Sequence, residues 1–162
     1  MATENKNLSN YDKNSLPSVK GSRFALVVSQ WNDNITENLY KGAVETLLDN
    51  GVAQSDIVKF EVPGSFELIF GCNQVHQTYK YDAVIAIGCV IQGDTKHFDF
   101  VCEGVTQGIK DLNLRYKVPT IFCVLTDNTM EQSLERSGGK HGNKGVEAAI
   151  TAIKMIDFNK NV

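Results

Sequence analysis

The sequence has few of the residues that mark special classes of protein. Its 162 residues include only four cysteines, three histidines, three prolines and one tryptophan. The cysteines are widely spaced, form no Cys-x-x-Cys pair and sit in apolar segments. We therefore expect free, buried thiols in a reducing, cytoplasmic compartment rather than disulfides. The histidines form no zinc-type cluster with them, so no metal site is expected.

Long apolar runs and an excess of positive charge are also missing. No run is long enough to span a bilayer, and no apolar segment of the signal-peptide kind follows the N-terminus, so we expect neither a membrane span nor a secretory signal. Lys and Arg number 16 against 19 Asp and Glu, for a net charge of -3. A dedicated nucleic-acid binder usually carries a basic excess, so no nucleic-acid partner is expected.

The length and the 42% hydrophobic content are those of one ordinary globular domain. Residues 1–20 are rich in Asn, Lys and Ser and lack apolar periodicity. They predict a flexible N-terminal arm, followed by a single domain over residues 21–162.

Apolar runs and helical periodicity alternate through that domain. The expected strands are 23–29, 57–62, 81–89 and 120–125. Helices are expected after each strand, with Asn34 as the first N-cap, Glu37 completing a capping box, and Ser65 as the second N-cap. The later helices are expected over 97–116, 130–136 and around 146–153. This order predicts an α/β fold: a three-layer α-β-α sandwich with a four-stranded parallel sheet, as in flavodoxin-like proteins.

In such folds ligands bind beyond the carboxyl ends of the strands. That rule selects four loops, which begin at Gln30, Pro63, Gly88 and Thr126. The third loop superficially matches a phosphate-binding P-loop, but Asp94 stands where that motif needs lysine, so a nucleotide-triphosphate site is rejected. Thr95 at a helix N-terminus could still favour one phosphate, or the segment could be a plain turn and cap.

Other residues in these loops also have two interpretations. Trp31 could cover the edge of the sheet or stack on an aromatic ligand, with Asn32 supplying polar contacts. His97 suits proton transfer at a cleft, or is an ordinary surface histidine. Glu67 could simply favour a helix dipole. The glycine-rich basic stretch that begins at Arg136 is either a solvated connector or an anion site.

Taken in order, five segments carry a specific signature. They are Trp31-Asn32, Val62-Pro-Gly-Ser-Phe-Glu67, Gly88 to Phe98, Leu125 to Gln132, and Arg136 to Ala149. With these segments the chain resembles the 6,7-dimethyl-8-ribityllumazine synthase family over about residues 23–156. The family joins 5-amino-6-(D-ribitylamino)uracil to 3,4-dihydroxy-2-butanone 4-phosphate, releases phosphate and water, and needs no metal or redox cofactor. This is the penultimate step of riboflavin biosynthesis.

The resemblance implies roles for individual residues. His97 matches the proposed proton donor, Trp31 the aromatic platform, and Arg136 the cation that clamps the phosphate. The other implied substrate-binding positions are Asn32, Ser65, Phe66 and Glu67 for the ribityl chain, Cys89, Val90 and Ile91 for the heterocycle, Asp94 and Thr95 for the phosphate, and Phe122 and Lys144.

The chain departs from the usual family pattern at three positions. Cys89 replaces a small residue or threonine, Gln92 replaces a cation, and Trp31 replaces the more usual phenylalanine. Three alternatives stay open: a non-catalytic lumazine- or flavin-binding module, a related riboflavin synthase that dismutates two lumazine molecules, and a receiver-type signalling domain. The last needs an acidic cluster at the strand ends, whereas the first strand here leads into Ser29-Gln-Trp31.

The resemblance also implies a homo-oligomer of pentamers with active sites at subunit interfaces. Phe122, Arg136 and Lys144 would come from the neighbouring subunit. The short connector Gly138 to Gly142 favours an icosahedral capsid over a single pentamer or a pentamer pair. Association with riboflavin synthase is a further expectation.

The large indole at position 31 leads to a first prediction. A flavin offers a wide aromatic face, so riboflavin is expected to stack on Trp31 and quench the fluorescence of this single tryptophan. A fluorescence titration measures the effect directly. Absence of quenching at high micromolar riboflavin would end the idea.

Overall fold

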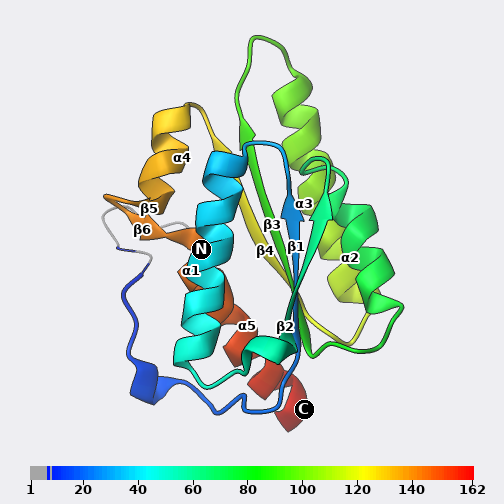
Figure 1. Ribbon diagram of the computed structural model, residues 1–162. Helices are drawn as coiled ribbons and strands as arrows, with labels where there is room; N and C mark the ends of the chain where they lie inside the picture. The colour runs from blue at the N-terminus through cyan, green and yellow to red at the C-terminus, as the bar shows by residue number, and fades with distance from the viewer. Residues whose placement is uncertain (1–6, 8) are drawn as a thin grey trace.

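The computed structural model describes residue 7 and residues 9–162. At its centre lies one sheet of four parallel strands in the order β2-β1-β3-β4 (Figure 1). The strands are β1 (Phe24–Ser29), β2 (Ile57–Val62), β3 (Ala83–Ile91) and β4 (Thr120–Asp127). The four-stranded parallel sheet expected from the sequence is therefore confirmed.

Helices cover both faces of this sheet (Figure 1). The five α-helices are α1 (Asp33–Asp49), α2 (Leu68–His76), α3 (His97–Arg115), α4 (Met130–Arg136) and α5 (Lys144–Asn161). Helices α1 and α5 share one hydrophobic cluster with the sheet, and α2 and α3 share the other. This arrangement confirms the three-layer sandwich. Short elements complete the fold: 3-10 turns at Lys13–Ser15 and Gln54–Asp56, and an antiparallel pair of β5 (Ser137–Gly139) and β6 (Gly142–Asn143).

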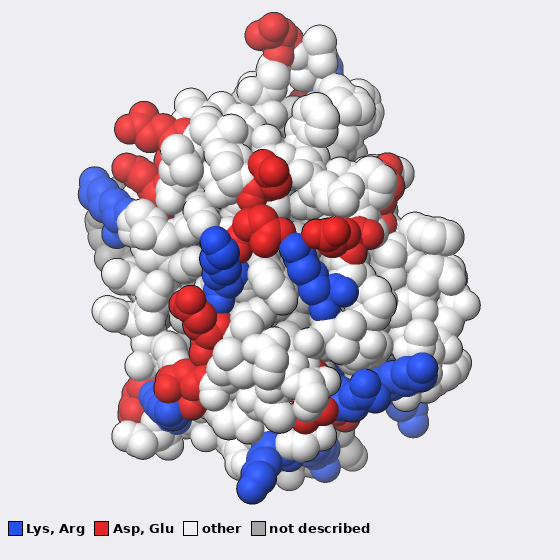
Figure 2. Space-filling view, in the orientation of Figure 1, with Lys and Arg blue, Asp and Glu red and all other residues white. Residues whose placement is uncertain are grey.

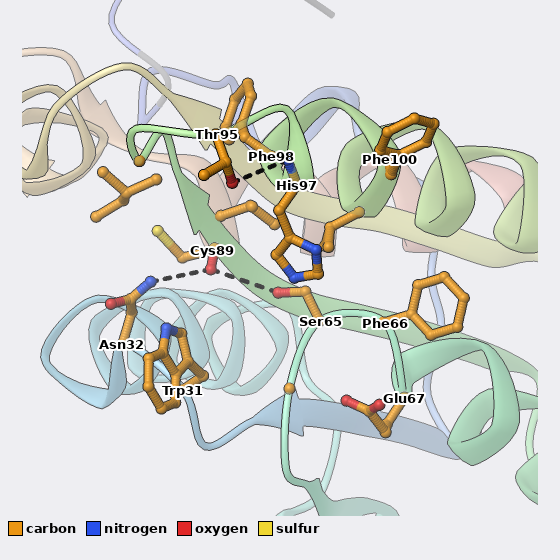
Figure 3. A pocket seen from close by; sticks show the side chains of 15 residues that line it. Trp31, Asn32, Ser65, Phe66, Glu67, Cys89, Thr95, His97, Phe98 and Phe100 are labelled. Carbon is orange, nitrogen blue, oxygen red and sulfur yellow. Dashed lines mark hydrogen bonds between the residues drawn. The ribbon is translucent and has the colours of Figure 1, made fainter.

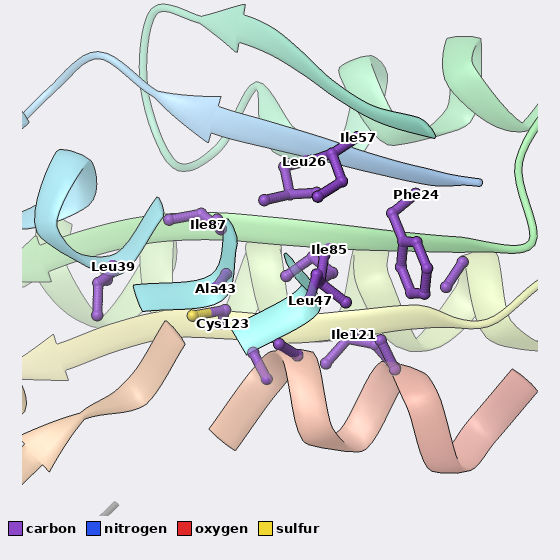
Figure 4. Packing of buried hydrophobic residues seen from close by; sticks show 14 of the residues in the cluster. Phe24, Leu26, Leu39, Ala43, Leu47, Ile57, Ile85, Ile87, Ile121 and Cys123 are labelled. Atoms are coloured by element: carbon purple, nitrogen blue, oxygen red, sulfur yellow. The ribbon is translucent and has the colours of Figure 1, made fainter. Parts of the chain in front are cut away.

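Burial on both faces explains why the inner strands consist of continuous apolar runs. All six residues of β1 are buried, as are the first seven residues of β3. Leu26 and Ile85 point toward α1 and α5. Figure 4 shows Ile85 beside Leu47 and Leu26 beside Ile57. Ala25 and Val84 point toward α2 and α3. No face of these strands is left for polar chemistry, so ligand contacts must lie at the strand ends.

Two predicted helix caps are wrong. Helix α1 begins at Asp33, and its N-cap position is Asn32, which makes no capping bond through its side chain. Asn34 lies inside the first turn, and Glu37 forms an ion pair with Lys59 of β2 instead of a capping box. Helix α2 begins three residues after Ser65, at Leu68. In both places a contact with another element replaced the local cap.

The strands β3 and β4 both end two residues later than predicted, and β3 also begins two residues later, at Ala83. Their pairing continues through Val90 with Thr126 and Ile91 with Asp127. Periodicity did not indicate this extension because polar residues follow the apolar run of β4. Asp127 is therefore the last residue of β4 and not part of the loop that follows the strand.

Part of the predicted N-terminal arm, residues 1–6 and 8, lies outside the described residues. In the described part, Tyr11 and Lys13 both contact the carboxylate of Asp49, at 2.9 and 2.7 Å. The side chain of Val19 is buried in the core. Residues 11–19 thus contact the rest of the chain, and the domain boundary at residue 20 stays a prediction.

The expectation of free thiols is confirmed for all four cysteines. Cys72, Cys89 and Cys123 are buried, whereas Cys102 is half-buried. Across the described chain, none of the helices is both long and apolar enough to cross a bilayer. On the face shown in Figure 2, basic and acidic side chains are interspersed, without the continuous basic surface typical of nucleic-acid binders.

Candidate active site

A cavity of about 590 Å³ opens at the carboxyl end of the sheet (Figure 3). It is formed by the loops that follow β1, β2 and β3, three of the four loops selected from the sequence, and by the start of α3. Its lining residues are Trp31, Asn32, Gly64, Ser65, Phe66, Glu67, Cys89, Val90, Ile91, Gly93, Thr95, His97, Phe98, Phe100 and Val101.

The aromatic wall of the cavity comes from Trp31. Hydrogen bonds between β1 and β2 continue past the strand ends, from Gln30 N to Val62 O at 2.8 Å and from Trp31 N to Pro63 O at 3.1 Å. They fix the backbone of Trp31 while its indole remains 72% exposed at the cavity. An indole this exposed does not cover the edge of the sheet, so the geometry favours a stacking platform.

The carbonyl oxygen of Cys89 joins three segments of the chain. It accepts hydrogen bonds from Asn32 Nδ2 at 3.1 Å and from Ser65 Oγ at 3.4 Å (Figure 3). Asn32 adopts the left-handed backbone conformation, with φ of 59°, and this turns its amide back toward β3. A Cβ atom on Gly88 would lie 2.7 Å from Ser65 Oγ, so glycine is needed for this approach.

The side chain of Cys89 points to the other side, toward α4. Its Sγ lies 3.4 Å from Ser133 Oγ, and that hydroxyl donates to Asp127 Oδ2 at 2.8 Å. Burial raises the pKa of the Cys89 thiol to about 11, and the negative charge of Asp127 acts in the same direction. The thiol is therefore protonated at neutral pH and is not a nucleophile.

The first turn of α3 supplies His97. Its backbone N–H donates to Thr95 Oγ1 at 3.3 Å, and its exposed imidazole projects toward Ser65 across the cavity (Figure 3). Gly93 and Thr95 of the preceding loop line the cavity, whereas Asp94 lies outside the lining. A histidine at the mouth of a cleft is a common proton donor and acceptor in catalysis.

Phe66 and Glu67 form the rim next to α2. Phe66 is half exposed and lies so close to Gly104 that a Cβ atom there would meet its ring at 2.6 Å. Glu67 occupies the N-cap position of α2 without a capping bond, and its carboxylate folds back over Gly64. Both side chains remain available to a ligand in the cavity.

Three further predicted residues lie away from this cavity. Phe122 and Lys144 line a separate cavity of about 290 Å³ between β4 and α5, where Lys144 Nζ lies 2.9 Å from Glu147 Oε2. Arg136 ends α4, where its Nη1 donates to Gln132 O at 2.9 Å. The chain therefore gathers the predicted ring and ribityl contacts and His97 in one place, and leaves the predicted cations elsewhere.

Sequence reasoning gave no role to Ser133 or to Asp127. Asp127 does fall in the fourth strand-end loop that the fold rule selects, and that position was the available signal. Ser133 gave no signal, because only the folded position of α4 places it next to Cys89. Among the described residues, no group of three or more His, Cys, Asp or Glu side chains is arranged to hold a metal ion.

Comparison with known proteins gives a consistent result. A sequence model of the 6,7-dimethyl-8-ribityllumazine synthase family matches residues 21–160. The proteins named 6,7-dimethyl-8-ribityllumazine synthase from Flavobacterium johnsoniae and Christiangramia forsetii are 68% and 61% identical to the chain. The first match covers 96% of this chain and 82% of the relative, and the second covers 99% and 96%. A relative of the same name from Parabacteroides distasonis is 55% identical, with 98% and 99% covered.

The left-handed conformation of Asn32 leads to a second prediction. Both Asn32→Gly and Asn32→Ala remove the hydrogen bond to the Cys89 carbonyl. Glycine adopts the left-handed backbone conformation of this position without strain, whereas alanine does not. The alanine variant is expected to be about 1 kcal/mol less stable than the glycine variant. Thermal unfolding at equal protein concentration measures the difference. Equal midpoints for the two variants would show that the backbone conformation at this position costs nothing.

Proposed function

The chain belongs to the 6,7-dimethyl-8-ribityllumazine synthase family, and on this premise we propose that its strand-end cavity condenses 5-amino-6-(D-ribitylamino)uracil with 3,4-dihydroxy-2-butanone 4-phosphate. The products are 6,7-dimethyl-8-ribityllumazine, inorganic phosphate and water, so the protein is a transferase of riboflavin biosynthesis. One observation carries the proposal: an aromatic platform, a row of polar contacts and His97 line the same cavity.

The pyrimidine ring is proposed to stack on Trp31, whose face is exposed to the cavity. Cys89, Val90 and Ile91 line the cavity at the end of β3, where they would contact the edge of the heterocycle. Ser65 and Glu67 belong to the segment between β2 and α2, and they suit the hydroxyl groups of the ribityl chain.

The chemistry consists mainly of proton transfers. The amine of the uracil attacks the ketone to form a carbinolamine, which loses water to give an imine. His97 would shuttle protons in this dehydration and in the elimination of phosphate that follows. Ring closure and the second loss of water then depend mostly on holding the two ends together.

The phosphate requires positive charge that this cavity does not have. No Lys or Arg is present among the described residues that line it, and Glu67 adds a negative charge. We propose that Arg136 and Lys144, together with Phe122, come from a neighbouring copy of the chain. Thr95 at the start of α3 would add backbone N–H groups to the same phosphate.

An apolar surface next to the cavity supports this assembly. Phe66, Phe70 and Phe100 are 52%, 69% and 69% exposed, and a groove of about 580 Å³ runs between α2 and α3. Exposed apolar area of this kind favours contact with another protein surface. We propose pentamers, assembled further into an icosahedral shell because the β5–β6 connector is short. The four free thiols suit a reducing, cytoplasmic compartment.

A third prediction concerns turnover and His97. The purified protein, supplied with the two substrates, is expected to form a product with lumazine absorbance. His97→Ala is expected to lower kcat by about 10²-fold or less, because the substrates are reactive and one proton shuttle contributes only part of the rate. Absorbance assays over a range of substrate concentrations measure kcat and KM.

His97→Gln serves as the matched control, since it keeps a polar side chain of similar reach but cannot shuttle a proton at neutral pH. It is expected to be as slow as His97→Ala. No detectable turnover by a folded, substrate-binding His97→Ala protein would contradict the modest role assigned to His97. Riboflavin formation from lumazine alone would instead indicate the related synthase.

A fourth prediction tests the shared site. In oligomers assembled from equal amounts of His97→Ala and Arg136→Ala subunits, an interface between unlike subunits can combine an intact His97 with an intact Arg136. About a quarter of the interfaces should then regain wild-type activity if mixing is random. Co-expression with two different affinity tags isolates the mixed oligomers for assay. Activity equal to the mean of the two single variants would show that each subunit uses its own Arg136.

A further inference from the structure

A connected set of polar contacts crosses the carboxyl ends of β3 and β4, and it reaches the lining of the cavity only at Cys89. Asp127, the last residue of β4, stands at the centre of it. One carboxylate oxygen, Oδ2, accepts the hydrogen bond from Ser133, which in turn contacts the Cys89 thiol. The other oxygen, Oδ1, lies 3.9 Å from Nε of Arg136. The carboxylate of Asp127 thus connects Cys89, which lines the cavity, through Ser133 with Arg136, the residue expected to bind the phosphate.

The position of α4 makes this double contact possible. Thr129 caps the helix by accepting from Gln132 N at 3.3 Å, and Gln132 Oε1 accepts from Asn128 N at 2.9 Å. These bonds help to start the helix at Met130, three residues after Asp127. Ser133 and Arg136 are three residues apart on it, so they share one side of the helix and both reach the carboxylate.

The guanidinium group of Arg136 is held at two points. Its Nη1 donates to the carbonyl of Gln132 at 2.9 Å, and its Nε faces Asp127. A guanidinium has five N–H donors, so three N–H groups of Arg136 are left besides the one that donates to Gln132 and the one that faces Asp127. The side chain of Arg136 is 35% exposed, whereas that of Asp127 is only 12% exposed. The carboxylate is thus a fixed support, and the cation is the part that an incoming anion can reach.

We propose that Asp127 is a positioning residue, which orients Arg136 for the phosphate of the ketone substrate and, through Ser133, also braces Cys89 at the floor of the pyrimidine cavity. The inference rests on the function proposed above. Asp127 does not line the cavity, so it acts on the substrate through these two neighbours. In the proposed assembly Arg136 serves the site of the neighbouring subunit. Asp127 and Ser133 would connect it to Cys89, which lines the cavity of its own subunit.

The opposite effect of the Asp127 charge has to be weighed. A carboxylate beside an arginine also weakens the attraction of that arginine for a phosphate. If this were its main effect, removal of the charge would tighten phosphate binding. If Asp127 acts mainly by orienting the Arg136 guanidinium, phosphate binding weakens when the Asp127 charge is removed. It also weakens when the charge is kept but moved along a longer side chain. Asp127→Asn and Asp127→Glu separate the two cases.

Binding of inorganic phosphate to the assembled protein, measured by isothermal titration calorimetry, gives a readout that needs no turnover. Asp127→Asn and Asp127→Glu are each expected to weaken phosphate binding about threefold to tenfold. Arg136→Ala is expected to weaken it further. Ser133→Ala leaves the Asp127–Arg136 contact in place and is expected to keep the wild-type phosphate affinity, so it is the matched control.

Steady-state kinetics adds a second, independent readout. Asp127→Asn is expected to raise KM for the phosphate-bearing ketone by a larger factor than KM for the pyrimidine. Ser133→Ala is expected to raise KM for the pyrimidine instead, because it frees the Cys89 side of the network. A residue that only supports the fold would change both KM values together.

The outcomes separate this inference from the proposed function. Phosphate binding that is insensitive to Arg136→Ala would overturn the proposed role of Arg136 itself. Phosphate binding that needs Arg136 but is unchanged or tighter in Asp127→Asn would overturn only the role of Asp127. If Asp127→Asn does not assemble, Asp127→Glu decides: unchanged phosphate affinity in that variant contradicts the inference.

Discussion

The site depends on the backbone carbonyl of Cys89 at the end of β3, which accepts its hydrogen bonds from side chains and not from the neighbouring strand β1. Pairing between β1 and β3 ends at Val28 and Ile87, so the carbonyl of Cys89 has no partner on the β1 strand. A buried carbonyl without a hydrogen bond is costly, and here the side chains of Asn32 and Ser65 satisfy it. These two bonds draw the loops after β1 and β2 against the end of β3. They thereby bring Trp31 and the Ser65 loop into the lining of one cavity.

The burial of the inner strands also directs ligand contacts to this edge of the sheet. Helices bury both faces of the inner strands, so polar contacts are confined to the strand ends. At that edge the cavity has aromatic surface, backbone polar groups and a histidine, but no cation among its described lining residues. The side chains that could supply positive charge, Arg136 and Lys144, lie on the β4 side. In the proposed function this cavity holds the pyrimidine, and a neighbouring copy of the chain supplies the positive charge for the phosphate ester.

Much of the fold could be predicted from the sequence because the signals were local. The apolar runs of β1 and β3 and the periodicity of the long helices required no knowledge of tertiary structure. The helix caps at Asn34 and Ser65 were wrong because distant partners compete for those residues: Glu37 pairs with Lys59, and Ser65 donates to Cys89. The cavity lies at three of the four loops that the strand-end rule selected, whereas the roles of its residues stay predictions. The link from Asp127 through Ser133 to Cys89 could not be predicted, because it depends on where a seven-residue helix lies.

In the proposed assembly one chain provides half of a complete site, and its neighbour provides the other half. Specific activity measured over a wide range of protein dilution, with the oligomeric state of the same samples determined by mass photometry, tests this arrangement. Lumazine formation is expected to decline in proportion to the fraction of assembled subunits, and isolated monomers are expected to bind the pyrimidine without turning over. Monomers with the full specific activity of the assembly would contradict it.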